Sequence, residues 1–203
     1  MTKIFTIIED CAPYYVRFTH NNIEKIIEIS KDAVANEEWT TDFSNKRLGP
    51  EIVETVKELS PLYNYFDLSR RRVAMFVSQP GLYYQAHKDG LNHKFSLNYT
   101  VKILDDKCVT SWYSDEDLKG YQITNLVTLT SRECMGFDKT KHTPLKTMVA
   151  KPNECILFNS DIFHDWDNSA SDHERMVLTL RLIDYSKPGS TFEDARQIIL
   201  GLS

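Results

Sequence analysis

Short runs of apolar, β-branched and aromatic residues, separated by turn-forming residues, fill the middle of this 203-residue chain. Each run has the length of a strand rather than that of a helix. A Gln-Pro-Gly turn divides the first two runs, and a polar Asn-Ser-Ala-Ser-Asp turn precedes the last. This pattern restricts the middle of the chain to a mainly β structure. The predicted strands are residues 73–77, 82–86, 95–101, 156–158 and 175–182.

Residues with metal-binding side chains follow two of these strands. His87 and Asp89 end the second strand and, being two residues apart, would point to the same side of an extended segment. His164 follows the run at 156–158. Two imidazoles and one carboxylate can hold a ferrous ion on one face, leaving other positions for a cosubstrate and oxygen. The set favours an iron-dependent oxygenase; the alternative is a pair of buried, hydrogen-bonded histidines and a turn aspartate.

An arginine opens the last predicted strand. Arg175 stands eleven residues after His164. Arg181 has the same parity along this strand and could reach the same side, with a salt bridge on the wall of the sheet as the alternative. Asn98, in the third strand, is either a polar contact in the pocket or a hydrogen-bonded strand residue.

Helical periodicity flanks the β region on both sides. Between residues 21 and 35 the apolar positions fall largely on one face, and Gly49-Pro50 opens a second amphipathic stretch. Near the end, the segment from Ser190 to Glu193 resembles a capping box before a short helix that stops at Gly201. We therefore expect helices to support the β core from both ends.

Composition and charge narrow the class of protein. With 41% hydrophobic residues, the chain can bury a sizeable core as one domain. The formal net charge of -5 argues against a nucleic-acid partner. The cluster Arg70–Arg72 is the local exception, and either an anionic ligand or a solvated, salt-bridged face would explain it.

Cysteine usage and the N-terminus bear on location. The four cysteines are widely spaced, with no Cys-x-x-Cys pair, so we expect free thiols in a reducing compartment. The first ten residues lack the apolar core of a signal peptide, and no later run has the length to cross a bilayer. The expected location is the cytoplasm, without a membrane partner, and the oligomeric state stays open. The cysteines are Cys11, Cys108, Cys134 and Cys155.

From Val73 to Leu182, about half of the chain, the order of strands and ligands resembles the iron(II)- and 2-oxoglutarate-dependent dioxygenases. The prolyl hydroxylase and aspartyl/asparaginyl hydroxylase branches are the most similar. The resemblance implies a mainly β fold with flanking helices, on a double-stranded β-helix core of the jelly-roll, cupin-like type. We expect a single domain over residues 1–203, made of a helical N-terminal support (1–70), the β-helix core (71–185) and a C-terminal helix (186–203).

The resemblance also implies roles for single residues. His87, Asp89 and His164 would bind Fe(II), and Arg175 would pair with the far carboxylate of 2-oxoglutarate, because a planar guanidinium can hold a carboxylate with two charge-assisted hydrogen bonds. Tyr84 stands where several prolyl hydroxylases have a tyrosine near the cosubstrate, although simple strand alternation puts it on the face opposite His87. Further candidates for contacts with 2-oxoglutarate are Asn98 and Arg181.

The activity that the resemblance implies is hydroxylation of an unactivated C–H bond, with O2 and 2-oxoglutarate consumed. We expect the substrate to be an amino-acid side chain, in a peptide or as a free small molecule. The alternative is a non-catalytic metal-binding or structural module on the same fold. Residues 113–142 would form a lid or substrate loop, or else extra strands. The other histidines are expected at the surface, away from the metal: His20, His93, His142 and His173.

Overall fold

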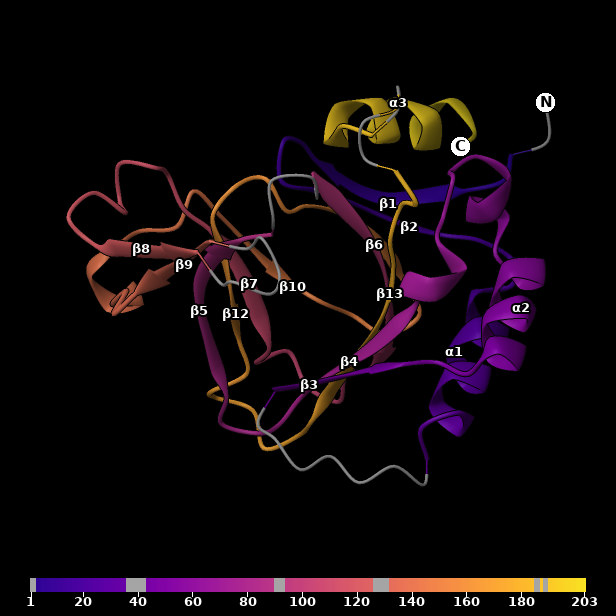
Figure 1. The fold of residues 1–203 in the computed structure, drawn as a ribbon, viewed down its shortest axis with the longest axis horizontal. Helices are drawn as coiled ribbons and strands as arrows, with labels where there is room; N and C mark the ends of the chain where they lie inside the picture. The colour runs from indigo at the N-terminus through magenta and orange to yellow at the C-terminus, as the bar shows by residue number, and fades with distance from the viewer. Residues whose placement is uncertain (1–2, 36–42, 90–93, 126–131, 185–186, 188–189) are drawn as a thin grey trace.

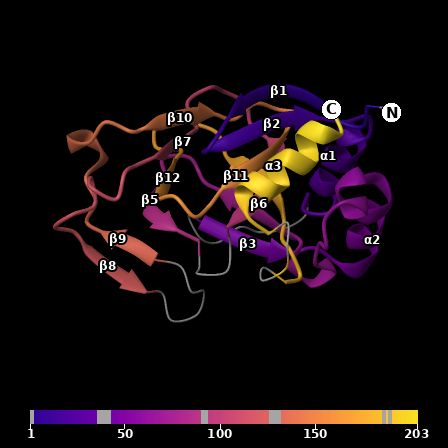
Figure 2. The same ribbon diagram turned by 90° about the horizontal axis from the view of Figure 1, so that it is seen from above.

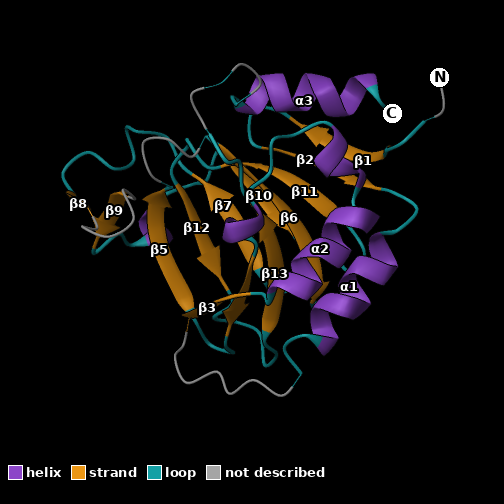
Figure 3. Ribbon diagram, turned by 45° about the vertical axis from the view of Figure 1, so that its right-hand side comes forward, coloured by secondary structure: helices purple, strands orange, loops and turns teal. Residues whose placement is uncertain are grey.

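Two β-sheets lie face to face, and the three α-helices cover the outer face of one of them (Figure 1, Figure 3). The computed structural model describes residues 3–35, 43–89, 94–125, 132–184, 187 and 190–203. The seven-stranded sheet, here called the major sheet, has the order β1 (Thr6–Cys11), β2 (Tyr15–Thr19), β11 (Cys155–Asn159), β6 (Phe95–Lys102), β13 (Arg175–Leu180), β4 (Ala74–Ser78) and β3 (Phe43–Arg47). The six-stranded minor sheet has the order β10 (Lys146–Val149), β7 (Val109–Trp112), β12 (His164–Asp167), β5 (Tyr83–Lys88), β9 (Arg132–Met135) and β8 (Gln122–Asn125).

The chain alternates between the two sheets. From β4 to β7 successive strands fall in the major, minor, major and minor sheets, and β10 to β13 repeat this alternation from the minor sheet. All strand pairs of the described residues are antiparallel. This topology is a double-stranded β-helix of the jelly-roll type, so the fold class predicted from the sequence is confirmed.

The major sheet is buried on both faces, and strand alternation sorts its side chains between them. On β6, Leu97 and Tyr99 point to the helices, whereas Asn98 lines the cavity between the sheets. On β13, Leu178 lies on the helical side, and Arg175 on the cavity side. One strand therefore supplies both an apolar core and a polar site.

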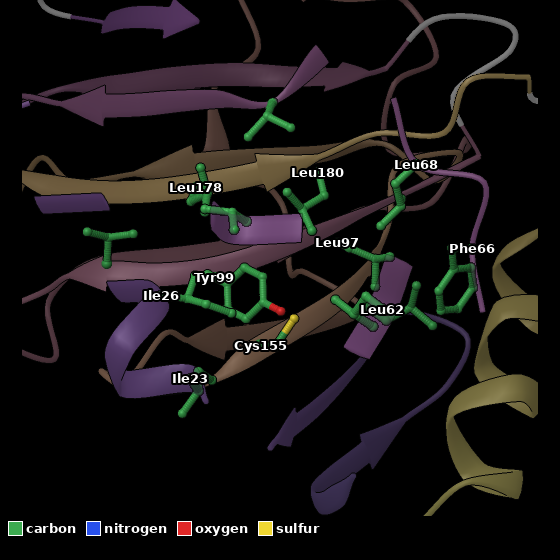
Figure 4. Close-up of a cluster of buried hydrophobic side chains, with 14 of the residues drawn as sticks. Ile23, Ile26, Leu62, Phe66, Leu68, Leu97, Tyr99, Cys155, Leu178 and Leu180 are labelled. Carbon is green, nitrogen blue, oxygen red and sulfur yellow. The ribbon is translucent and has the colours of Figure 1, made fainter. Parts of the chain in front are cut away.

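Three helices close the outer face of the major sheet. They are α1 (Ile23–Asp32), α2 (Pro50–Leu59) and α3 (Phe192–Gly201), and α3 lies across β11 (Figure 2). Ile23 and Ile26 of α1 pack against the β6 and β13 side chains in the buried cluster of Figure 4. Each apolar side chain buried there contributes about 1.5–3 kcal/mol, which fixes the sheet that carries the site. Of the described helices, none is both long and apolar enough to cross a membrane.

The terminal segments meet beside α3. The backbone N–H groups of Ile4 and Phe5 both donate to the carbonyl oxygen of Leu202, at 2.8 and 3.2 Å. The helix is capped by Thr191, whose hydroxyl accepts from the N–H of Asp194. The capping box predicted one residue earlier, at Ser190, is therefore wrong, because Thr191 takes the extended conformation that a cap needs.

The N-terminal region differs from the helical support expected for residues 1–70. It contains α1 and α2, but β1, β2 and β3 also belong to the major sheet. Polar and charged residues interrupt their apolar positions, so no long apolar run marks them in the sequence. Arg70 opens a short 3-10 helix (Arg70–Arg72) and forms an ion pair with Glu54 at 2.9 Å, consistent with the salt-bridged alternative. Two further short 3-10 helices are Pro61–Asn64 and Lys139–Lys141.

Extra strands are present in residues 113–142, the segment for which a lid or additional strands were the two possibilities. β9 pairs with β5 and β8 pairs with β9, which extends the minor sheet at its edge (Figure 1). Tyr113 and Phe137 of this segment pack in a small apolar cluster with Ala86, on the side of β5 away from the cavity. Residues 126–131 lie outside the described part of the chain.

Candidate metal centre

The structure brings His87, Asp89 and His164 together at one end of the minor sheet. Their ligand atoms all lie within 4.8 Å of one another. β5 ends at Lys88, and the turn behind it is held by the Asp89 N–H, which donates to the carbonyl oxygen of Ser160 at 3.2 Å. His164 opens β12, the strand that pairs with β5, and stands directly opposite His87. Neighbouring strands thus place three residues, distant in sequence, within reach of one ion.

Backbone carbonyls fix the tautomer of both imidazoles. The His87 Nδ1–H donates to the carbonyl oxygen of Gln85 at 2.8 Å, and the His164 Nδ1–H donates to that of Ile162, also at 2.8 Å. A carbonyl oxygen only accepts hydrogen bonds, so Nδ1 carries the proton and Nε2 keeps a free lone pair. Such contacts orient metal-binding histidines and strengthen them as ligands. The pair is therefore arranged to present both Nε2 atoms to the same point.

Aromatic side chains surround the two imidazoles. The His87 and His164 rings are 4.3 Å apart, and Phe158 meets the His164 ring edge to face at 4.6 Å. Burial, followed by the neighbouring His87 charge, lowers the pKa of His164 to about 3. The neutral imidazole is the form that binds a metal, so this ligand remains available at acidic pH.

Tyr84 contacts His87, contrary to the alternation expected from the sequence. Its ring lies 4.8 Å from the His87 ring, in an edge-to-face arrangement. The reason is a bulge, because three residue steps on β5, from Tyr84 to His87, oppose two on β12, from Trp166 to His164. An extra residue reverses the parity of a strand. Tyr84 supports His87 but is not among the residues that line the cavity.

A cavity of about 120 Å³ extends from His87, Asp89 and His164 between the two sheets. Arg175, at the start of β13, lines it and is only 6% exposed. Its Nη1 lies 3.6 Å from the Cys108 sulfur and its Cζ 4.6 Å from the Trp166 ring centre, while its Nε has no hydrogen-bond partner. In the described part of the chain, no carboxylate lies within ion-pairing distance of this guanidinium. A buried cation without an internal counter-ion suits an anionic ligand.

The other candidates also face this cavity. Asn98 lines it, and its Oδ1 is buried without a hydrogen-bond partner. Arg181 lines it too, with its Cζ 5.7 Å from the centre of the Phe76 ring. The salt bridge proposed for Arg181 as an alternative is absent from the described residues. The site thus contains two arginines and one orphaned amide on the inner face of the major sheet.

Trp166 and Cys108 are the residues of the site that the sequence analysis missed. The Trp166 indole N–H donates to the Cys108 sulfur at 3.2 Å, and the indole face lies against Arg175. Trp166 follows His164 by two residues, so period-two alternation could have placed it beside the metal ligands. No comparable signal marks Cys108, which lies just before β7 and reaches the site only through sheet pairing.

Asp165 anchors the strand that carries His164. It is fully buried and accepts from the N–H of Ser111 at 3.0 Å and from the hydroxyl of Tyr113 at 2.7 Å. Burial raises the pKa of its carboxyl group, and the two donors oppose that rise. These bonds tie β12 to β7 next to His164, so they help to fix the position of this candidate ligand.

Of the other histidines, the three that the structure describes lie away from His87, Asp89 and His164. His20 is buried, not at the surface as predicted, because it bonds to the Tyr99 hydroxyl at 2.9 Å in the core below α1. His142 is half-buried and contacts Tyr121 and Asp117, and His173 is exposed. His93 lies outside the described residues. The four cysteines are free thiols, as expected.

Comparisons with known proteins place the fold. No family model matches the sequence, and no curated protein is significantly similar to it. HygX from Streptomyces hygroscopicus, solved with nickel, 2-oxoglutarate and hygromycin B bound, superposes with a TM-score of 0.52 at 7% identity, covering 83% of this chain and 83% of HygX. EvdO2 from Micromonospora carbonacea var. aurantiaca, complexed with 2-oxoglutarate, gives 0.52 at 9% identity, covering 87% and 92%. At these identities the similarity establishes a shared fold alone.

Proposed function

We propose that this protein is an iron(II)- and 2-oxoglutarate-dependent oxygenase. The observation that carries the proposal is the occurrence, in one cavity, of the three potential ligands and a buried Arg175 that lacks a carboxylate partner in the described chain. A metal site alone would not require that arginine. A carboxylate pocket alone would not require two imidazoles with their Nε2 lone pairs aimed at one point.

The residues present fit both groups. Two neutral imidazoles and one carboxylate suit ferrous iron and leave coordination positions open. The orphaned Arg175 Nε is a donor that a carboxylate of 2-oxoglutarate would satisfy, whereas the orphaned Asn98 Oδ1 is an acceptor that a hydroxyl, an amine or a water molecule would satisfy. The fold shared with HygX and EvdO2, whose structures contain 2-oxoglutarate, supports the same cosubstrate here.

Each residue then has a defined part in the reaction. When bound, iron and 2-oxoglutarate would activate O2, which is the oxidant: oxidative decarboxylation of 2-oxoglutarate to succinate and carbon dioxide would supply two of the four electrons that O2 takes up, and the C–H bond of the substrate the other two. His87, Asp89 and His164 would hold the iron on one face, and Arg175 would anchor the far carboxylate of 2-oxoglutarate. Met148, with neighbouring apolar side chains, excludes water from the cavity and strengthens these charged contacts.

We further propose that the reaction hydroxylates a C–H bond of an amino-acid side chain, in a peptide or free. The acidic balance of the chain disfavours a nucleic-acid track. The HygX structure contains hygromycin B, which supports a small molecule as the kind of substrate that this fold accommodates.

Metal-dependent conversion of 2-oxoglutarate to succinate tests the proposal. Purified protein with Fe(II) and O2 should release succinate, slowly without a substrate and faster with peptides or amino acids that gain one oxygen by mass. His164→Ala should lose metal binding and succinate release, because one of three ligands is removed. His173→Ala, which removes an exposed histidine outside the site, is the matched control and should behave as wild type. If no metal-dependent succinate is released, either without a substrate or with any peptide or amino acid tested, a non-catalytic module on this fold would be favoured.

A further inference from the structure

Two arginines at the two ends of one strand line the cavity: Arg175 opens β13, and Arg181 follows its last residue. Arg175 and Arg181 are six residues apart, an even spacing that puts both on the inner face of the major sheet. At about 3.3 Å per residue, their backbones are separated by roughly 20 Å along the strand. Between them, Val177 and Thr179 also line the cavity. The two guanidinium groups therefore approach one cavity from opposite ends of β13, the strand that lines it.

Arg181 differs from the ion-paired arginines of the protein. Arg17, Arg70 and Arg196 each have a carboxylate within 3.0 Å. Arg181 lies over the Phe76 ring, and no described carboxylate is within ion-pairing distance of it. A guanidinium over an aromatic face keeps its N–H groups free at the edge. Its charge is thus held at the cavity without being neutralised there by the described chain.

A count of the charges in the cavity shows that 2-oxoglutarate does not neutralise Arg181. Under the proposed function, the ferrous ion, Asp89, Arg175 and the two carboxylates of 2-oxoglutarate sum to zero charge. With one of its carboxylates at the metal and the other at Arg175, 2-oxoglutarate has no charged group left for a second arginine. The other carboxylate beside the cavity, Asp165, already accepts from Ser111 and Tyr113. One positive charge remains at Arg181, and a partly desolvated charge favours a partner.

We propose that Arg181 binds a carboxylate of the prime substrate, which is a small organic acid or free amino acid rather than an internal residue of a peptide. This inference rests on the proposed function. The planar guanidinium can form two parallel hydrogen bonds to a carboxylate, which fixes both the position and the orientation of the substrate. Anchoring one end in this way places a carbon of the substrate over the metal and leaves the rest of the cavity to select its shape.

A matched pair of probes tests this assignment without turnover. Protein loaded with zinc, which is redox-inert, and saturated with 2-oxoglutarate is titrated with butyrate and with butyramide, which have nearly the same shape but differ in charge. Binding is followed by ligand-observed NMR. Wild type should prefer butyrate by about tenfold, the effect of a charge-assisted contact. Arg181→Gln should lose the preference while its 2-oxoglutarate affinity stays within about twofold of wild type.

Arg70→Gln is the control, because it removes an exposed arginine that is ion-paired with Glu54, outside the cavity. It should keep the butyrate preference. Equal binding of the two probes to wild type, or an unchanged preference in Arg181→Gln, overturns the inference. So does a loss of 2-oxoglutarate affinity in Arg181→Gln as large as that in Arg175→Gln, which would make Arg181 part of the cosubstrate site.

The remaining outcomes separate this inference from the proposed function. Tighter binding of propyl phosphate than of butyrate would overturn the carboxylate assignment in favour of a phosphate monoester. Failure of wild type to bind zinc and 2-oxoglutarate would refute the proposed function and, with it, this inference. Normal binding of both without a carboxylate preference would refute the inference alone.

Discussion

Two buried arginines, Arg17 on β2 and Arg175 on β13, differ in what surrounds their charge. Arg17 donates from Nε to Glu154 at 2.8 Å and from Nη1 to Glu9 at 3.0 Å. Arg175 is equally buried but contacts a thiol and an indole, and its Nε has no partner. The first cation is compensated within the chain and holds two strands together. The second has no carboxylate partner in the described chain, so the comparison separates an arginine that is neutralised within the fold from one that, under the proposed function, is left to bind an anion.

Stability measurements should show the largest contrast between them. Arg17→Met leaves the buried Glu154 carboxylate without its cation, so the free energy of unfolding should fall by about 3–5 kcal/mol. Arg175→Met removes a cation with no internal partner, and the free energy of unfolding should change by about 1 kcal/mol or less. Urea denaturation of both variants without metal measures the difference. Similar losses of unfolding free energy in the two variants would show that Arg17 and Arg175 do not differ in how the fold neutralises their charge.

A second fully partnered group, His20, should make stability depend on pH. Its Nδ1 accepts from the Asn22 N–H at 3.3 Å, its Nε2–H donates to the Tyr99 hydroxyl, and burial lowers its pKa to about 4. Between that value and the ordinary value of 6.5, the unfolded chain binds a proton that the folded protein does not. The contribution of neutral His20 to the free energy of unfolding is therefore fully present above about pH 6.5. It falls as the pH drops, by about 2 kcal/mol between pH 7 and pH 5.

The variant His20→Gln isolates that contribution. Because burial also lowers the pKa of His164, and carboxyl groups titrate in the same range, only the difference between wild type and variant reports His20. Between pH 7 and pH 5, the free energy of unfolding of the variant should fall by about 2 kcal/mol less than that of wild type. Parallel pH profiles for the two proteins would show that His20 is not held neutral in the folded state.

The smallest effect concerns the thiol beside Arg175. Cys108 accepts from the Trp166 indole and lies 3.6 Å from the Arg175 guanidinium, so it helps to hold the arginine in place. Cys108→Ala should weaken 2-oxoglutarate binding by about threefold, the effect of losing a weak orienting contact. Cys134→Ala, a buried thiol in the apolar cluster outside the cavity, is the matched control. Equal affinities for the two variants would mean that Arg175 is oriented by the indole alone.

The sequence was sufficient to predict what depends on local periodicity. Alternation put His87 and Asp89 on one side of a strand and Arg175 with Arg181 on one side of another, and all four line the cavity. The apolar runs predicted β4, β5, β6, β11 and β13, the helical repeats predicted α1 and α2, and α3 was expected from a capping signal that lies one residue before the actual cap. These features are encoded within about ten residues of chain each.

Long-range pairing was beyond the sequence. Glu154 belongs to no motif, yet it is the partner of Arg17, 137 residues away. The bulge in β5 that turns Tyr84 towards His87 arises from pairing with β12, and nothing within β5 announces it. The edge strands β1 and β8, and β9 next to β8, are short or mixed in polarity, so their existence depends on the strands beside which they lie.

Calorimetric titration of 2-oxoglutarate into anaerobic, Fe(II)-loaded protein tests most directly whether Arg175 binds a carboxylate of 2-oxoglutarate. Wild type should bind one molecule per chain, and Arg175→Gln should bind it about 30-fold or more weakly, because a buried carboxylate loses its charged partner. Iron affinity should be the same in both. Equal 2-oxoglutarate affinity in the two proteins, or no binding to wild type, would contradict the account.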